Sequence, residues 1–124
     1  MKLHHAALVC SSQKNADRFY EGILKLKKIK TMPLKHDLTQ KIFGLDVSCL
    51  LILYGNEDIA IEVFVTDQVP SQETSLTHLC LKMEDREAFL AACRSVGLAV
   101  NIVPRGESEL CFVRDFDGNL FEIK

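Results

Sequence analysis

The pattern of apolar and polar positions changes period along the first half of the chain. Short apolar segments, which are typical of strands, occupy residues 3–10, 27–34, 48–55 and 59–65. After the first of them, apolar residues recur at helical spacing, which predicts an amphipathic helix over residues 11–24. Residues 35–46 are compatible with one helical turn or with a loop that ends at Gly44. The first half therefore predicts a strand, a helix and three further strands.

The same order returns after a polar stretch, residues 66–75, which contains a proline, has no periodicity and is interpreted as a linker. Beyond it, the pattern predicts a strand at 76–83, a helix at 84–97, and strands at 99–103, 110–115 and 120–124, with a turn at 104–108. Two βαβββ repeats are expected, residues 1–68 and 74–124. Because one repeat alone cannot cover both faces of its sheet, we expect a single α+β domain over residues 1–124, in which the modules form a cupped mixed sheet with helices outside.

Superposing the two repeats pairs residues of the same chemistry. His5 matches His78 in the first strands, and Glu62 matches Glu122 in the last strands. Strand alternation turns His4 away from the face of His5. Imidazole and carboxylate together suit Ni, Zn, Co, Mn or Fe(II), and facing carboxylates are costly without a cation between them. We therefore expect one divalent metal ion held by His5, Glu62, His78 and Glu122.

The composition of the chain limits the classes of protein to which it could belong. Apolar residues make up 48% of the chain, charged residues 26%, and the formal net charge is −2. No basic stripe suggests nucleic-acid binding, and the longest apolar run, residues 49–54, is far below the roughly 18 residues of a membrane span. Without a recognisable targeting pattern, a cytoplasmic protein is expected. The five cysteines form no C-x-x-C pair and are expected to be buried, reduced thiols.

Five segments carry a resemblance to a known superfamily: "LHHAALVC", "ADRFYEGILKLK", "IAIEVF", "LTHLCLKMED" and "FVRDFDGNLFEIK". Together they resemble the glyoxalase / bleomycin resistance / extradiol dioxygenase proteins, also called vicinal oxygen chelate proteins, over nearly the whole chain. Phe116 stands where members typically have proline, a departure that affects a turn and not a ligand. The resemblance implies a homodimer, and a metal site that lies within one chain or is shared by two.

By the same resemblance, the four metal positions look like the glyoxalase I set. They imply a metal-dependent lyase or isomerase that moves a proton beside a carbonyl group, as in lactoylglutathione lyase or methylmalonyl-CoA epimerase. In such enzymes the metal polarises the substrate oxygens and stabilises an enediolate while a carboxylate shuttles the proton. Glu122 is the first candidate for that carboxylate and Glu62 the second. The partner would be a small carbonyl or thioester substrate, whose binding residues stay unassigned.

Two other functions stay open. An extradiol-type dioxygenase would need an added histidine or tyrosine near the metal, for which His36 and Tyr54 are candidates. A non-catalytic, resistance-type protein would use the same cup to bind a small molecule. The chain has no arginine between Arg18 and Arg86, which weakens the case for glutathione, and the lysines of residues 25–41 are interpreted as a solvated face.

Overall fold

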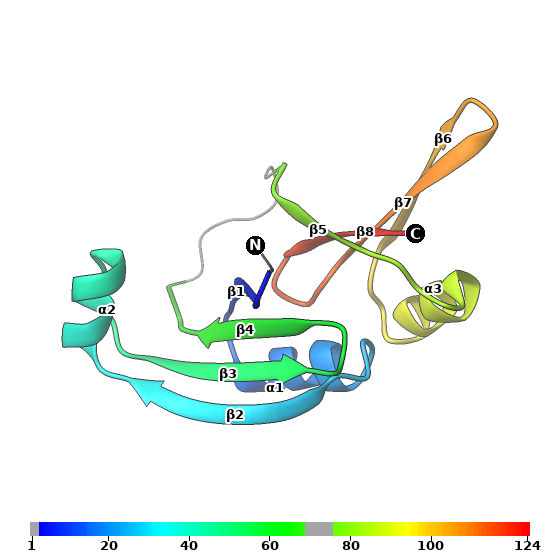
Figure 1. Ribbon diagram of the computed structural model, residues 1–124. Coiled ribbons are helices and arrows are strands. Elements are labelled where there is room, and N and C mark those ends of the chain that lie inside the picture. The colour runs from blue at the N-terminus through cyan, green and yellow to red at the C-terminus, as the bar shows by residue number, and fades with distance from the viewer. Residues whose placement is uncertain (1–2, 69–75) are drawn as a thin grey trace. The chain divides into compact units, whose positions relative to one another are not determined.

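Strand pairing produces two four-stranded mixed sheets of identical topology (Figure 1). The computed structural model describes residues 3–68 and 76–124, and the chain divides into two units at residue 69. In each sheet the first strand of the unit pairs in parallel with the last, and the remaining pairs are antiparallel. The predicted α+β class and the two βαβββ modules are therefore confirmed.

The first unit has the strand order β1-β4-β3-β2. Its elements are β1 (Ala6–Cys10), α1 (Gln13–Ala16), the π-helical turn η1 (Asp17–Glu21), β2 (Lys27–Leu34), α2 (His36–Phe43), β3 (Cys49–Gly55) and β4 (Ala60–Val65). Ser12 caps α1 by accepting a hydrogen bond from the amide of Asn15 at 3.2 Å. Gly44 ends α2 in the left-handed region, at φ 69°.

The second unit has the equivalent order β5-β8-β7-β6. Its elements are β5 (His78–Leu81), α3 (Arg86–Ser95), β6 (Val100–Arg105), β7 (Ser108–Arg114) and β8 (Leu120–Ile123). Asp85 caps α3 through the amide of Ala88 at 2.9 Å. The extra helix α2 therefore distinguishes the first unit from the second.

Several predicted boundaries were wrong. The helix expected over residues 11–24 changes from α-helical to π-helical bonding at Asp17, and the ambiguous residues 35–46 contain a two-turn helix, α2. The turn expected at 104–108 is shorter, because β6 continues through Arg105. The first strand begins at Ala6, so both His4 and His5 precede it. Most of the predicted linker, residues 69–75, lies outside the described residues.

Each sheet has its buried core on one face. In the first unit, buried side chains alternate along β3 and β4 (Ile52, Tyr54, Ile61 and Val63), and η1 contributes the buried Phe19 and Tyr20. Helix α1 contacts β1 and β4, and η1 contacts β2. In the second unit the corresponding core consists of Cys111, Val113, Phe121, Ile123, Phe89, Leu90 and Cys93. We call the other face of each sheet the histidine face, since it carries Glu62 in the first unit and His78 and Glu122 in the second.

All five cysteines are free thiols, as expected. Cys10, Cys93 and Cys111 are buried and Cys49 is partly buried, but Cys80 is exposed, so the expectation of burial was wrong for it. Across residues 3–68 and 76–124, no helix is both long and apolar enough to cross a membrane.

Candidate metal centre

In the first unit, the structure brings His5 and Glu62 together. The chain enters β1 at Ala6, beside Ile61 of β4, and this parallel pairing sets the preceding histidine next to Glu62. The imidazole Nε2 of His5 lies 3.3 Å from Oε2 of Glu62. The two side chains are 37% and 22% exposed, so this histidine and this carboxylate face each other at a solvent-accessible position.

The second unit repeats this arrangement. Nε2 of His78 lies 3.6 Å from Oε2 of Glu122, whose side chain is only 14% exposed. The other imidazole nitrogen, Nδ1, lies 2.9 Å from the carbonyl oxygen of Leu76. With the proton on Nδ1, this hydrogen bond leaves the Nε2 lone pair directed at a carboxylate, and a backbone carbonyl is the usual outer partner of a metal-binding histidine. Two acceptor atoms that face each other in this way need a proton or a cation between them.

The spacing within each pair suits a metal ion. Two ligand atoms each about 2.1 Å from one ion are separated by roughly 3.0 to 3.4 Å at octahedral or tetrahedral angles. The observed separations, 3.3 and 3.6 Å, lie at or just above that range. Each unit alone supplies two donors: in the described part of the chain, no three His, Cys, Asp or Glu side chains converge on one point suited to a metal. Four ligands therefore require both pairs.

The cross-strand register shows that the two pairs are equivalent. In the first sheet, one row across the strands consists of Ala7, Glu62, Leu53 and Lys30. In the second sheet, the corresponding row consists of Cys80, Glu122, Phe112 and Asn101. Both glutamates thus occupy the same position in their sheets, as the superposed repeats predicted, while the residues around them differ.

The surroundings make the two carboxylates unequal. Nζ of Lys124 lies 3.4 Å from Oε1 of Glu122. Cys80 stands opposite Glu122, and partial desolvation of the thiol, followed by this carboxylate, raises the pKa of Cys80. Among the residues described, the imidazole of His5 is the one basic group within 4 Å of the Glu62 carboxylate. Sequence reasoning overlooked Lys124, although its place two residues after Glu122 on one strand already predicted a shared face.

A buried aspartate fixes the turn that leads into Glu122. Oδ1 of Asp115 accepts hydrogen bonds from the amides of Asp117 and Asn119, both at 2.9 Å, and Oδ2 accepts one from the side-chain amide of Asn119 at 2.8 Å. Gly118 takes a φ of 88°, which favours glycine. Phe116 lies in this turn, so the replacement of proline leaves the ligand strand intact.

The two residues considered for a dioxygenase do not lie beside Glu62. Tyr54 is fully buried on the helix side of the first sheet, and its hydroxyl donates a hydrogen bond to Oδ1 of Asp17 at 2.7 Å. Burial, together with the Asp17 carboxylate, raises the pKa of Tyr54. His36 begins α2 and pairs with the exposed carboxylate of Asp46 at 3.4 Å. Neither residue supports the dioxygenase hypothesis within the first unit.

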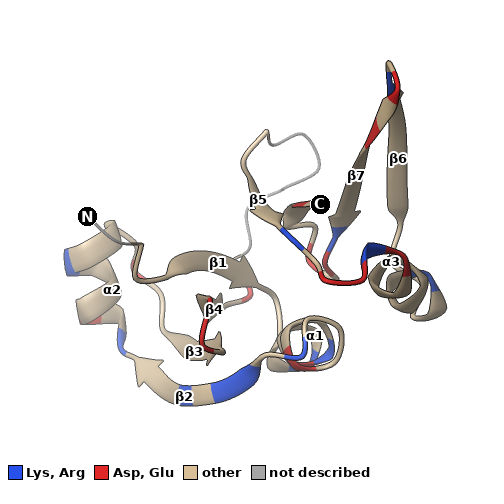
Figure 2. Cartoon of the chain, turned by 45° about the vertical axis from the view of Figure 1, so that its right-hand side comes forward, with Lys and Arg blue, Asp and Glu red and all other residues tan. Residues whose placement is uncertain are grey.

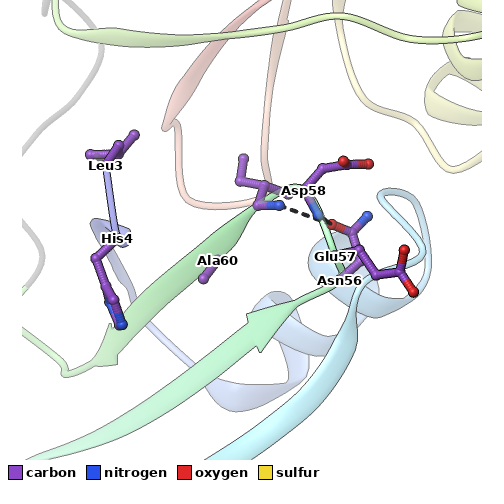
Figure 3. Close-up of a pocket in the computed structure, with 7 residues that line it drawn as sticks. Leu3, His4, Asn56, Glu57, Asp58 and Ala60 are labelled. Atoms are coloured by element: carbon purple, nitrogen blue, oxygen red, sulfur yellow. Dashed lines mark hydrogen bonds between the residues drawn. The ribbon is translucent and has the colours of Figure 1, made fainter. Parts of the chain in front are cut away.

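His4 is closer to its neighbour than strand alternation predicted. Its Nδ1 lies 2.9 Å from Nδ1 of His5 with the rings edge to face, because neither residue belongs to β1. His4 also lines a shallow depression of about 250 Å³ (Figure 3). The opposite wall is the β3–β4 loop, where Oδ1 of Asn56 accepts from the amides of Asp58 and Ile59. Glu57 and Asp58 make this wall acidic.

Comparisons with known proteins identify the fold. No protein-family model and no curated protein sequence matches the chain. Among solved structures, a glyoxalase family protein from Enterococcus faecalis is similar, with a TM-score of 0.75 and 19% identity over 98% of this chain and 95% of that one. A glyoxalase family protein from Bacillus cereus gives a TM-score of 0.76 and 16% identity, over 99% and 92%.

A third similar structure contains a metal. It is a mutant of FosX, a fosfomycin resistance protein from Listeria monocytogenes, complexed with Mn(II) and 1S,2S-dihydroxypropylphosphonic acid. Its TM-score is 0.73 and its identity 15%, over 98% of this chain and 87% of that one. The chain therefore has the fold shared by glyoxalase family and FosX proteins, the vicinal oxygen chelate fold.

Proposed function

We propose that this protein is a divalent-metal-dependent lyase or isomerase that transfers a proton at a carbon beside a carbonyl group. The observation that carries the proposal is the duplication of one ligand pair. His5 with Glu62, and His78 with Glu122, present the same atoms to each other at equivalent positions in two sheets of identical topology. Surface histidines without a shared role would not be expected to face a glutamate at the matching position of both units.

Both pairs would contribute to one metal ion, within one chain or across a homodimer. The donor set, two imidazole nitrogens and two carboxylates, suits Mn, Fe, Co, Ni or Zn better than Ca or Mg, which prefer oxygen ligands alone. The Mn(II) in the FosX complex supports a metal of this kind in the same fold. When bound, the metal would polarise the substrate carbonyl.

One of the two carboxylates would carry the proton, and their contacts give them different roles. Glu122 is 14% exposed and lies beside Lys124 and Cys80, neighbours that we expect to hold it in place. Glu62 is more exposed, at 22%, and faces His5. Glu62 is therefore freer to leave a metal ion and accept a proton from carbon, while Glu122 would stay as a fixed ligand. The resemblance alone placed these two residues in the opposite order.

Deuterium exchange tests the proposal without knowledge of the natural substrate. The Mn(II)-loaded protein is incubated in D2O with enolisable acyl thioesters and 2-hydroxy ketones, and loss of the α-proton signal is followed by NMR. We expect metal-dependent exchange on at least one class, reduced by about two orders of magnitude or more in Glu62→Gln, the usual contribution of general base catalysis. His36→Ala, a histidine on α2, should leave exchange unchanged.

Three results would contradict the proposal. Exchange at the same rate in the metal-free protein would exclude a role for the ion. Full exchange in both Glu62→Gln and Glu122→Gln would exclude a carboxylate base. Absence of exchange on every substrate, with tight small-molecule binding, would favour a non-catalytic binding protein.

A further inference from the structure

The first sheet contains a β-bulge that has no equivalent in the second. Between Lys28 and Lys30 the pairing of β2 with β3 shifts by one residue, so that Ile29 is the extra residue. The corresponding pair, β6 with β7, runs in continuous register from Val100 to Arg105. Bulges of this kind redirect the side chains that follow them and are common next to active sites.

The bulge places Lys30 on the histidine face. Lys28 pairs with Tyr54 and lies on the helix side of the sheet, whereas Lys30 pairs with Leu53, which pairs in turn with Glu62. Without the extra residue, Ile29 would take the position opposite Leu53, and Lys30 would turn to the buried side. The insertion therefore brings a cation into the cross-strand row of Glu62.

Gly55 accommodates this bulge. A Cβ atom on Gly55 would stand 2.9 Å from Cδ1 of Ile29, so the isoleucine side chain occupies the space that a larger residue would need. Leu53 separates Lys30 from Glu62 in the cross-strand row, and Ile29, which precedes Lys30 on β2, adds apolar surface beside Gly55.

Lys30 is available to bind an anion. The neighbouring Lys28 is engaged by Asp17 at 2.7 Å and Glu21 at 3.6 Å. Lys30, by contrast, has no carboxylate within 4 Å among the residues that the structure describes. Its counterpart in the second sheet is the uncharged Asn101. Figure 2 shows that basic residues are concentrated along β2.

We propose that Lys30 binds an anionic terminus of the substrate, a carboxylate or a phosphonate, while the carbonyl end lies at the His5–Glu62 pair. Neighbouring strands are about 4.8 Å apart, so the backbone of Lys30, two strands from Glu62, lies roughly 10 Å from it. The substrate class is then an enolisable carbonyl compound whose apolar chain separates the carbonyl from a charged end. The acidic loop with Glu57 and Asp58 disfavours an anion at the depression beside His4. This inference rests on the proposed metal-dependent function.

Aliphatic hydroxamates of graded chain length test the inference by isothermal titration calorimetry. The hydroxamate group chelates the Mn(II)-loaded protein, and the far end is a methyl, a carboxylate or a phosphonate group. At the best length, the carboxylate should bind about fivefold tighter than the methyl compound, the upper range for an exposed ion pair. The phosphonate should gain more if the site prefers a dianion, and less if it is shaped for a carboxylate.

Variants assign the gain to one residue. Lys30→Asn, which copies the residue of the second sheet, should abolish the difference between the charged and methyl probes without changing manganese content. Lys30→Arg should keep it, and Lys41→Asn, an exposed lysine on α2, should leave it unchanged. Equal affinity of both probes for the parent protein, or a charge effect that survives Lys30→Asn, would overturn the inference and leave the metal site standing. Failure of every hydroxamate to bind in the presence of Mn(II) would instead overturn the proposed function.

Discussion

The contact between Tyr54 and Asp17 supports the most specific stability prediction. Tyr54 is fully buried in β3, stacks on Tyr20 with ring centroids 5.2 Å apart, and donates its hydroxyl to Asp17 at the start of η1. Tyr54→Phe keeps the ring and its burial and removes one hydrogen bond to a charged acceptor. The variant therefore isolates the bond that ties the π-helical turn to the sheet.

The expected loss is modest because Asp17 keeps its other partner. Hydrogen bonds to charged groups contribute about 1.5–3 kcal/mol, and we expect the lower half of that range. Lys28 still lies 2.7 Å from the carboxylate, which is 32% exposed and accessible to water. The melting temperature should fall by roughly 6 °C, at about 4 °C per kcal/mol for a domain of this size. Tyr54→Ala, which opens a cavity, should cost about 3–5 kcal/mol.

A double-mutant cycle measured by urea denaturation checks the assignment. Asp17→Ala leaves the Tyr54 hydroxyl buried without its acceptor, so Tyr54→Phe should cost little or become favourable in that background. An equal cost of Tyr54→Phe in both backgrounds would show that the hydroxyl acts through some other group. A cost below about 0.5 kcal/mol in the parent protein would show that this hydrogen bond does not tie the π-helical turn to the sheet.

Three further predictions concern Asp17, the turn held by Asp115, and Gly55. Burial opposes ionisation of Asp17, but the hydrogen bonds from Lys28 and Tyr54 outweigh it and lower the pKa of Asp17. Its contribution to stability is therefore present above pH 3.8 and lost as the pH falls below that value, and Asp17→Asn should flatten this part of a pH–stability curve. Asp115→Ala leaves turn amides without acceptors and should lower the free energy of unfolding by about 2–4 kcal/mol in denaturant titrations and weaken metal binding. Unchanged stability together with unchanged metal affinity would contradict the role of the turn. Gly55→Ala should lower the free energy of unfolding by about 1–3 kcal/mol, because the added methyl group crowds Ile29 and the Ile59 carbonyl. Adding Ile29→Ala should restore only part of this stability, because the carbonyl remains. Full recovery of stability would show that the backbone tolerates the methyl group.

Much of the fold was predictable because the repeat doubled every local signal. The bounds of β2 and the βαβββ order of elements in both units followed from alternation and turn residues, and matching the repeats selected Glu62 and Glu122. The strand alternation argument failed at His4, since β1 starts three residues later than the apolar pattern suggested. An apolar run does not show where backbone pairing begins.

The β-bulge and the π-helical turn were not predicted, because both depend on which backbone groups pair, and the amino-acid pattern does not show this. A β-bulge at Ile29 reverses the faces of every residue that follows in β2, and nothing in "KKIKTMPL" distinguishes the extra residue from a paired one. The π-helical turn at Asp17 was likewise not predictable, because a single turn of five residues is too short to change the apolar spacing of the segment recognisably. These two departures decide the surroundings of Lys30 and Asp17.

Metal stoichiometry is the most direct test of the central claim, which is that both ligand pairs serve one ion. The purified, untagged protein is stripped with chelator, reloaded separately with Mn(II), Ni(II) and Zn(II), and analysed for metal beside His5→Ala, His78→Ala and the control His36→Ala. We expect about one ion per chain in the parent and the control, and loss of tight binding in each single-ligand variant, His5→Ala from the first unit and His78→Ala from the second. Retention of one ion in both His5→Ala and His78→Ala, or no tight metal in the parent, would contradict this claim.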